Sequence, residues 1–273
     1  MSRVGLQVAI VLSLIALFSE QGSANFWREP ALPDDPNDEY YEQFQKVPPV
    51  NKTAIKLMEN FLRIGRRNGF GGRRGRSIIK EDIVIVMDSS GSIGNCEFTK
   101  GKKALKHMLN LASTNPQYNS MYAAVTYSSG VTVDFNFLPA FSASSNIMQA
   151  TYSGGGTNTA GGLAEAMTLF DDASSGRRQN SKKTVLLVTD GQSNNKDSTV
   201  AKAKELKRYG IEIFVVGVGS YINGIDEMVK VSSLPPHRYL FRVKTLSSLF
   251  DVVRLMIKEV RGESHLPQYE PPC

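Results

Sequence analysis

The sequence predicts an α/β fold: a doubly wound, mainly parallel sheet with helices on both faces and one antiparallel edge strand. First, residues 83–87 are a continuous apolar run and residues 184–189 an apolar run between two threonines, both rich in β-branched residues, which is typical of strands buried on both faces. Second, helix-spaced segments alternate with such runs, and this alternation produces crossover connections between parallel strands. Third, strand-like runs at 121–127 and 131–137 flank Ser128-Ser129-Gly130, which predicts a hairpin and hence the antiparallel edge strand.

The remaining elements follow in order along the chain. Residues 97–112 place apolar side chains at helical spacing, among them Phe98, Leu105 and Met108. The same reasoning predicts further helices at 160–171, 198–209, 223–232 and 246–261, and further strands at 211–218 and 238–243. We therefore expect one domain over residues 80–262, followed by a proline-rich tail over 263–273 that ends in a cysteine.

Length and composition exclude several classes of protein. The chain has 273 residues, of which 41% are apolar and 21% are charged, so it is neither wholly disordered nor collagen-like. The formal charge of +6 is unevenly distributed and indicates no nucleic acid partner. Two cysteines cannot form a four-cysteine zinc site, and three histidines far apart in the sequence argue against a His-rich zinc hydrolase.

Residues 1–24 have the pattern of a secretory signal peptide. Arg3 gives a positive start, residues 4–18 are almost continuously apolar, and Gly22 and Ala24 are the small residues that a signal peptidase requires. The apolar stretch is shorter than the ~20 residues that span a membrane, and no later segment is long and apolar enough. We expect cleavage before Asn25 and a secreted protein without a membrane span.

Residues 25–79 are expected to be a mostly flexible extension, acidic and then basic. A short helix at about 51–64 interrupts it, and Asn51-Lys52-Thr53 is a candidate N-glycosylation site. Arg73 and Arg76 fit the Arg-x-x-Arg pattern of processing proteases, which would make the extension a propeptide. The arginine-rich run could instead bind sulfated glycans, or serve only as a solvated linker.

Oxygen-bearing side chains follow the strands where such sheets bind ligands. Asp88-Ser89-Ser90-Gly91-Ser92 follows the first strand, Asp190 follows the 184–189 strand, and the glycine-rich loop 154–159 precedes a helix. Singly, each loop is explained by helix caps and turns. Together they supply carboxylates and hydroxyls without imidazole or thiolate, the donor set of Mg²⁺, Ca²⁺ or Mn²⁺.

These motifs resemble the von Willebrand factor type A domains. The resemblance covers the whole predicted domain, and its motifs match the metal-ion-dependent adhesion site of that family. It implies that Ser90, Ser92 and Thr157 ligate a divalent ion directly, and that Asp88 and Asp190 do so directly or through water. It also implies that a carboxylate of an extracellular protein, such as a collagen or another matrix protein, completes the coordination shell.

The sequence leaves the state of the two cysteines open. Cys96 follows the first ligand loop and Cys273 is the last residue, so an intramolecular bridge, a disulfide-linked oligomer and a free Cys96 all remain. No Gly-x-Ser-x-Gly motif with a partnered histidine supports a hydrolase, so we expect no catalytic residues and no enzyme activity.

The favoured hypothesis is a secreted adhesion or matrix protein of the matrilin- or collagen-like, single-domain kind, binding its ligand through a divalent ion. The alternative is a structural component of an extracellular or mineralised matrix, assembled through its charged extension and disulfide crosslinks.

Overall fold

The computed structural model describes residues 32–35, 38–64, 79–115 and 118–273. The chain divides into two compact units, Met1–Asp34 and Asp35–Cys273, and the second contains every element below. Its sheet has six strands in the order β3-β2-β1-β4-β5-β6. The strands are β1 (Ile79–Asp88), β2 (Tyr118–Tyr127), β3 (Val131–Pro139), β4 (Lys182–Thr189), β5 (Glu212–Val218) and β6 (Leu240–Val243).

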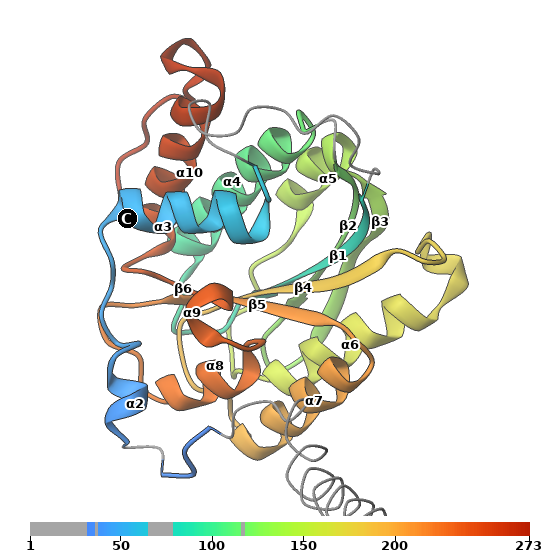
Figure 1. Ribbon diagram of the computed structural model, residues 1–273, viewed down its shortest axis with the longest axis vertical. Helices are drawn as coiled ribbons and strands as arrows, with labels where there is room; N and C mark the ends of the chain where they lie inside the picture. Colours follow the sequence, from blue (N-terminus) through green and yellow to red (C-terminus); the bar gives the residue numbers. More distant parts are fainter. Residues whose placement is uncertain (1–31, 36–37, 65–78, 116–117) are drawn as a thin grey trace, which may run out of the picture. The chain divides into compact units, whose positions relative to one another are not determined.

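The predicted fold class is confirmed. Strand β3 pairs antiparallel with β2 at one edge, and all other neighbouring strands are parallel. Helices cover both faces (Figure 1). On one face lie α4 (Asn95–Ala112), α5 (Ala140–Asn146) with η2 (Ile147–Gln149), and α10 (Leu246–Arg261); on the other lie α6 (Thr159–Asp171), α7 (Lys196–Arg208) and α8 (Ile225–Val231). Short elements complete the described part: α2 (Glu39–Glu42), α3 (Val50–Lys56), η1 (Leu57–Phe61), η3 (Ala173–Ser175), α9 (Pro236–Tyr239) and η4 (Glu263–His265).

Strand β1 shows why the apolar runs are continuous. Ile85 and Met87 belong to the core cluster shared with α4 and α10, while the alternate residue Val86 faces α6. Helix α6 can approach β1 closely because residue 162 is glycine. A Cβ at that position would lie 2.9 Å from the side chain of Val86. A central strand therefore needs apolar side chains at every position.

The N-terminal segment, residues 38–64, differs from the expected flexible extension. It forms α2, α3 and the π-helix η1, and it contributes buried side chains to the domain: Tyr41, Ala54, Leu57, Met58, Phe61 and Leu62. The rings of Phe61 and Phe214 meet edge to face at 5.2 Å. The predicted helix at 51–64 is thus present, but its apolar stripe is part of the main core instead of an isolated element.

Helix α3 also closes the open edge of the sheet. Strand β6 is the last strand, so part of its backbone has no neighbouring strand. Lys56 Nζ donates a hydrogen bond of 2.6 Å to the carbonyl of Leu240, and Thr53 Oγ1 donates one of 3.3 Å to the carbonyl of Arg242. Burial lowers the pKa of Lys56 to about 8. The segment therefore satisfies edge carbonyls that a partner strand would otherwise bond.

Two further elements differ from expectation. The first two residues of the predicted strand 238–243 end the short helix α9, so β6 begins at Leu240. Helix α5 was not expected. Among the described residues, no helix is long and apolar enough to cross a membrane.

The tail, residues 263–273, contacts helix α4 and ends in a disulfide. Cys273 is bonded to Cys96 in the first turn of α4, with a Cα–Cα distance of 6.0 Å. Glu270 accepts hydrogen bonds from Lys100 at 2.9 Å and Lys103 at 2.6 Å. Of the three states left open by the sequence, the structure has the intramolecular bridge.

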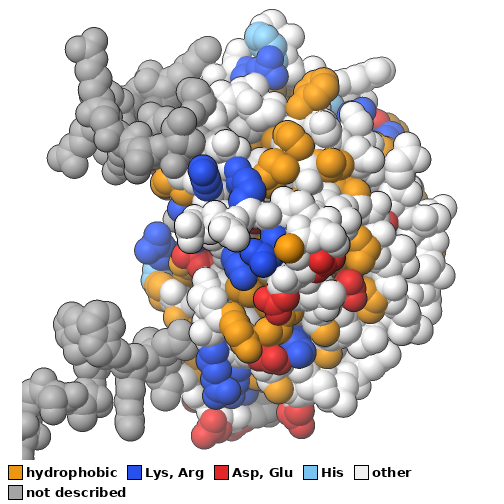
Figure 2. Space-filling model, turned by 90° about the vertical axis from the view of Figure 1, so that its right-hand side faces the viewer, with side chains coloured by type: hydrophobic (Ala, Val, Ile, Leu, Met, Phe, Trp, Pro, Cys, Tyr) orange, Lys and Arg blue, Asp and Glu red, His pale blue; other side chains and the backbone are white. Residues whose placement is uncertain are grey.

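The surface beside the β3 edge carries mixed side chains. Figure 2, which shows the side at the right of Figure 1, has small groups of hydrophobic side chains separated by Lys, Arg, Asp and Glu. The coloured part of this face therefore presents no uniform charge.

Candidate metal centre

Three loops converge at the carboxyl ends of the strands. Gly91 N donates a hydrogen bond of 2.9 Å to the carbonyl of Gly155, and Gly154 N donates one of 2.9 Å to the carbonyl of Ser89. Asn194 N donates one of 2.9 Å to the carbonyl of Thr157. The loops after β1 and β4 and the loop before α6 are thus joined through their backbones, as the position of the motifs at strand ends predicted.

Four of the predicted ligand residues form one hydrogen-bonded series. Asp88 Oδ1 accepts from the backbone N–H of Ser90 at 2.8 Å. The hydroxyls of Ser90 and Ser92 lie 3.1 Å apart, and Ser92 Oγ donates to Asp190 Oδ1 at 3.0 Å. The fifth residue, Thr157, lies in the loop before α6, which is joined to the loop after β4 by the hydrogen bond from Asn194 N. The side-chain oxygens of both Ser residues therefore lie between the two carboxylates.

Asp88 is held in place by two groups that the sequence analysis missed. Its Oδ2 accepts from Thr189 Oγ1 at 2.8 Å and from Tyr127 Oη at 3.3 Å. Asp88 is 1% exposed. Burial raises the pKa of Asp88, and burial followed by the charge of Asp88 raises the pKa of Asp190. Thr189 precedes Asp190 at the end of β4, so its place in the strand was the available signal.

The glycine-rich loop depends on close backbone approach. Gly155 has φ +94°, and a Cβ there would lie 2.9 Å from Ser129 Oγ. The same Ser129 hydroxyl accepts from the backbone N–H of Gly156 at 2.8 Å. A side chain at Gly155 would push the loop away from the hairpin turn and so displace Thr157.

The donor set fits a hard divalent cation. Among the described residues no Lys or Arg forms an ion pair with Asp88 or Asp190, although Asp88 is buried. Two carboxylates close together without a cationic partner are costly, and a metal ion supplies the missing charge. In the described part of the chain no group of three His, Cys, Asp or Glu residues could hold a metal. A metal here would rely on hydroxyl oxygens as well as carboxylates, which suits Mg²⁺, Ca²⁺ or Mn²⁺.

The other predicted site residues lie elsewhere. Asn51 is exposed in α3, where its Oδ1 accepts from Lys52 N at 2.9 Å, and its glycosylation stays a prediction. The signal peptide and the processing residues Arg73 and Arg76 lie outside the described residues.

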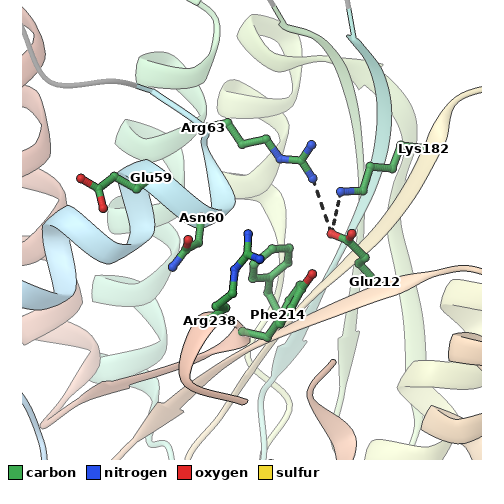
Figure 3. A pocket seen from close by; sticks show the side chains of 8 residues that line it. Glu59, Asn60, Arg63, Lys182, Glu212, Phe214 and Arg238 are labelled. Carbon is green, nitrogen blue, oxygen red and sulfur yellow. Dashed lines mark hydrogen bonds and ion pairs between the residues drawn. The ribbon is translucent and has the colours of Figure 1, made fainter. Parts of the chain in front are cut away.

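A polar cavity of about 380 Å³ lies at the amino ends of β4 and β5, the end of the sheet opposite to the converging loops. Figure 3 shows Arg63 and Lys182 directed at Glu212, with ion-pair distances of 3.5 and 2.6 Å. Phe214 forms part of its apolar wall. The pair of Arg63 with Glu212 joins the N-terminal segment to β5, and the pair of Lys182 with Glu212 joins β4 to β5. We assign both pairs a structural role.

The fold and the converging loops define an α/β domain that gathers carboxylate and hydroxyl oxygens at the carboxyl ends of its strands. The family model described as the von Willebrand factor type A domain matches residues 82–254, and the chain belongs to this family.

Relatives include two mouse proteins. The chain is 27% identical over 227 residues to "Sushi, von Willebrand factor type A, EGF and pentraxin domain-containing protein 1", covering 78% of this chain and 6% of the relative. It is 31% identical over 179 residues to the collagen alpha-4(VI) chain, covering 62% of this chain and 7% of the relative. The chain thus spans less than a tenth of the length of either relative. Because collagen VI and other matched relatives are extracellular matrix proteins, the expected extracellular location is confirmed.

A solved structure shares the fold. It is proximal thread matrix protein 1 from the mussel byssus with a zinc-occupied metal-ion-dependent adhesion site motif. The TM-score is 0.57 at 22% identity, and the match covers 67% of this chain and 48% of that one. At this identity the likeness concerns the fold alone.

Proposed function

We propose that the chain is a non-enzymatic extracellular protein that binds a carboxylate of a protein partner through a divalent cation. The residues that hold the ion are Asp88, Ser90, Ser92, Thr157 and Asp190. The observation that carries the proposal is the series of oxygen groups that links Asp88 to Asp190, since Asp88 is buried and has no Lys or Arg ion-pair partner in the described part of the chain.

A divalent ion bound between Asp88 and Asp190 would favour an acidic partner. The ion would supply a positive centre that binds carboxylate oxygen, and we favour Mg²⁺ over Ca²⁺ and Mn²⁺. Serine and threonine hydroxyls are neutral ligands, so they leave more of the charge of the ion for the partner than carboxylates in their place would. Ser92 is exposed and Asp190 is half-buried, so the site is open to solvent on the side where a partner would approach.

A matrix protein, such as a collagen, is the partner class we propose. The support is the membership of the chain in a family whose matched relatives include collagen VI. Sulfated glycans stay a second candidate ligand for the arginine-rich run at 63–76, most of which lies outside the described residues.

The alternative function, a matrix component assembled by disulfide crosslinks, loses support. Cys96 and Cys273 are bonded to each other, and the chain has two cysteines in total. Neither thiol is then available for a bond to another chain, so assembly of that kind would depend on the charged extension.

The test is a pull-down from extracellular matrix extract with residues 25–273, in Mg²⁺ and in EDTA. We expect partners that are retained in Mg²⁺, released by EDTA, and lost with Asp88→Ala or Asp190→Ala. The matched control is Asp171→Ala, an exposed residue at the far end of α6. Retention that is unchanged in EDTA and in both site variants would contradict the proposal.

A further inference from the structure

The loop after β5, residues 219–224, borders the metal centre. Strand β5 is the parallel neighbour of β4, so the loop after β5 and the loop after β4 both leave the sheet at the carboxyl ends of the strands. A Cβ on Gly224 would lie 2.9 Å from side-chain carbons of Gln192, the second residue after Asp190. In addition, Glu227, just beyond this loop, accepts from the backbone N–H of Ser193 at 3.2 Å.

This loop carries a large exposed aromatic side chain. Tyr221 is 70% exposed, whereas the next residue, Ile222, is fully buried. An anchored Ile222 fixes the backbone on one side of Tyr221 and leaves the ring facing solvent. Exposed aromatic side chains on a rigid backbone are frequent contact residues, because they bury a large area and lose little conformational entropy.

The N-terminal segment holds this loop through a pair of reciprocal hydrogen bonds. Gln45 Nε2 donates to the carbonyl of Ile222 at 2.8 Å, and Ile222 N donates to Gln45 Oε1 at 3.0 Å. Arg242 adds a second link, since its guanidinium donates to the carbonyl of Phe44 at 2.9 Å and to that of Gly219 at 2.7 Å. Residues 44 and 45 therefore secure the start and the middle of the loop.

We propose that Gln45 is a positioning residue for ligand binding and that Tyr221 is a second contact beside the metal ion. The partner would present an acidic residue for the ion and an apolar side chain next to it for Tyr221. This inference rests on the proposed function, and it adds the chemistry that the partner needs besides its carboxylate.

The first experiment tests, without any partner, whether the hydrogen bonds of Gln45 to Ile222 hold the loop in place. Amide hydrogen exchange is measured on the full mature chain in Mg²⁺, for wild type, Gln45→Ala and Gln43→Ala. Gln43 is the matched control because, within the described residues, its side chain donates to the carbonyl of Tyr40 in the same segment and does not reach the loop. We expect exchange at Ile222 to accelerate about tenfold or more in Gln45→Ala and to stay unchanged in Gln43→Ala. Unchanged exchange in Gln45→Ala would overturn the positioning role.

The second experiment tests the contact. The probe is a set of short synthetic peptides with one central glutamate followed by leucine, phenylalanine or alanine. We expect wild type in Mg²⁺ to prefer the leucine and phenylalanine peptides about tenfold over the alanine peptide, the gain from burying part of an apolar side chain. Tyr221→Ala should abolish this preference while binding stays sensitive to EDTA. Gln45→Ala should reduce the preference several-fold.

The controls separate this inference from the function on which it rests. Tyr209→Ala removes a tyrosine of similar exposure, 63%, which follows the C-terminal end of α7. This variant should keep the preference, as should Gln43→Ala. A preference that survives in Tyr221→Ala overturns the contact alone. If wild type retains no peptide in Mg²⁺, or retains all peptides equally in EDTA, the result contradicts the proposed function and the contact with it.

Discussion

Ser92 Oγ donates a hydrogen bond of 3.0 Å to Asp190 Oδ1, which joins the loop after β1 to the loop after β4 across 98 residues of sequence. The hydroxyl of Ser90 lies 3.1 Å from that of Ser92 and extends the connection toward Asp88. Neither carboxylate has a cationic side-chain partner among the described residues, so the metal-free site is a place of unfavourable charge that an ion would relieve.

Replacing Asp190 by Asn should therefore separate stability from metal binding. We expect Asp190→Asn to stabilise the chain in EDTA by on the order of 1 kcal/mol, because one of two neighbouring carboxylates loses its charge. In Mg²⁺ at about a hundred times the dissociation constant, wild type should gain about 2.7 kcal/mol and the variant almost nothing. Urea unfolding in both buffers measures the two effects. A variant that gains as much from Mg²⁺ as wild type would show that the ion binds elsewhere.

Replacing Phe61 by Ala should destabilise the whole domain. Phe61 is 3% exposed and packs on Phe214, so its removal leaves a cavity in the main core. We expect a loss of about 3–5 kcal/mol in the free energy of unfolding, measured by urea denaturation. The control, Phe141→Ala, removes a ring that is 72% exposed and should change stability by less than about 0.5 kcal/mol. If residues 38–64 were a flexible extension, Phe61→Ala would change the free energy of unfolding as little as Phe141→Ala does.

Cleavage after Arg76 should leave the N-terminal segment bound. The segment contributes buried apolar side chains and bonds from Gln45 and Lys56, and the disulfide does not attach it to the domain. After cleavage, size-exclusion chromatography under native conditions should give one peak, while denaturing gels should give two fragments with or without reductant. Separation of the fragments on the native column would refute this account of the segment.

The disulfide should stabilise the monomer and not crosslink chains. We expect the secreted protein to migrate as a monomer on non-reducing gels. Because the bonded cysteines are 177 residues apart, the double variant Cys96→Ser, Cys273→Ser should lose about 3–5 kcal/mol of stability. Reductant-sensitive oligomers of wild type would support crosslinking instead.

Asp134 should make stability depend on pH. Burial raises the pKa of Asp134 to about 6, and its Oδ2 has no hydrogen-bond partner among the residues that the structure describes. The folded state thus binds this proton more tightly than the unfolded state, whose pKa is about 3.9. The tighter proton binding of Asp134 in the folded state therefore stabilises the fold fully below about pH 4, and this contribution is lost as the pH rises through about 6.

Asp134→Asn should accordingly be more stable than wild type at pH 8, by about 1–2 kcal/mol, with no advantage at pH 4. Urea unfolding across this range gives the difference curve, and Asp171→Asn controls for loss of an exposed acid. A constant difference between pH 4 and 8 would exclude this carboxyl as the cause.

Much of the site was predictable because its ligands are neighbours of recognisable strands. Asp88 and Asp190 directly follow the predicted strands 83–87 and 184–189, and parallel strands bring such positions together. Thr189 and Tyr127 were missed, since a strand residue that donates a hydrogen bond to Asp88 resembles other strand residues in sequence. The position of Thr189 next to Asp190 was the one available signal. The partner of Gln45 lies 177 residues away, and no local pattern reports so distant a contact.

The N-terminal segment shows the limit for the fold. Helix α2 has four residues, of which Tyr41 is buried. A helix this short does not repeat its apolar positions, so its sequence shows no apolar face. Helix α5 is built mainly from small and polar residues, and neighbouring α4 and β3 determine its place. In both, tertiary packing outweighs the local signal.

The most direct test of the central claim is a crystal of the mature chain soaked in Mn²⁺. The account predicts an anomalous difference peak within coordination distance of the Ser90 and Ser92 hydroxyls, beside Asp190 and Thr157. Absence of a peak there at saturating Mn²⁺, or a peak only at another group of residues, would contradict it.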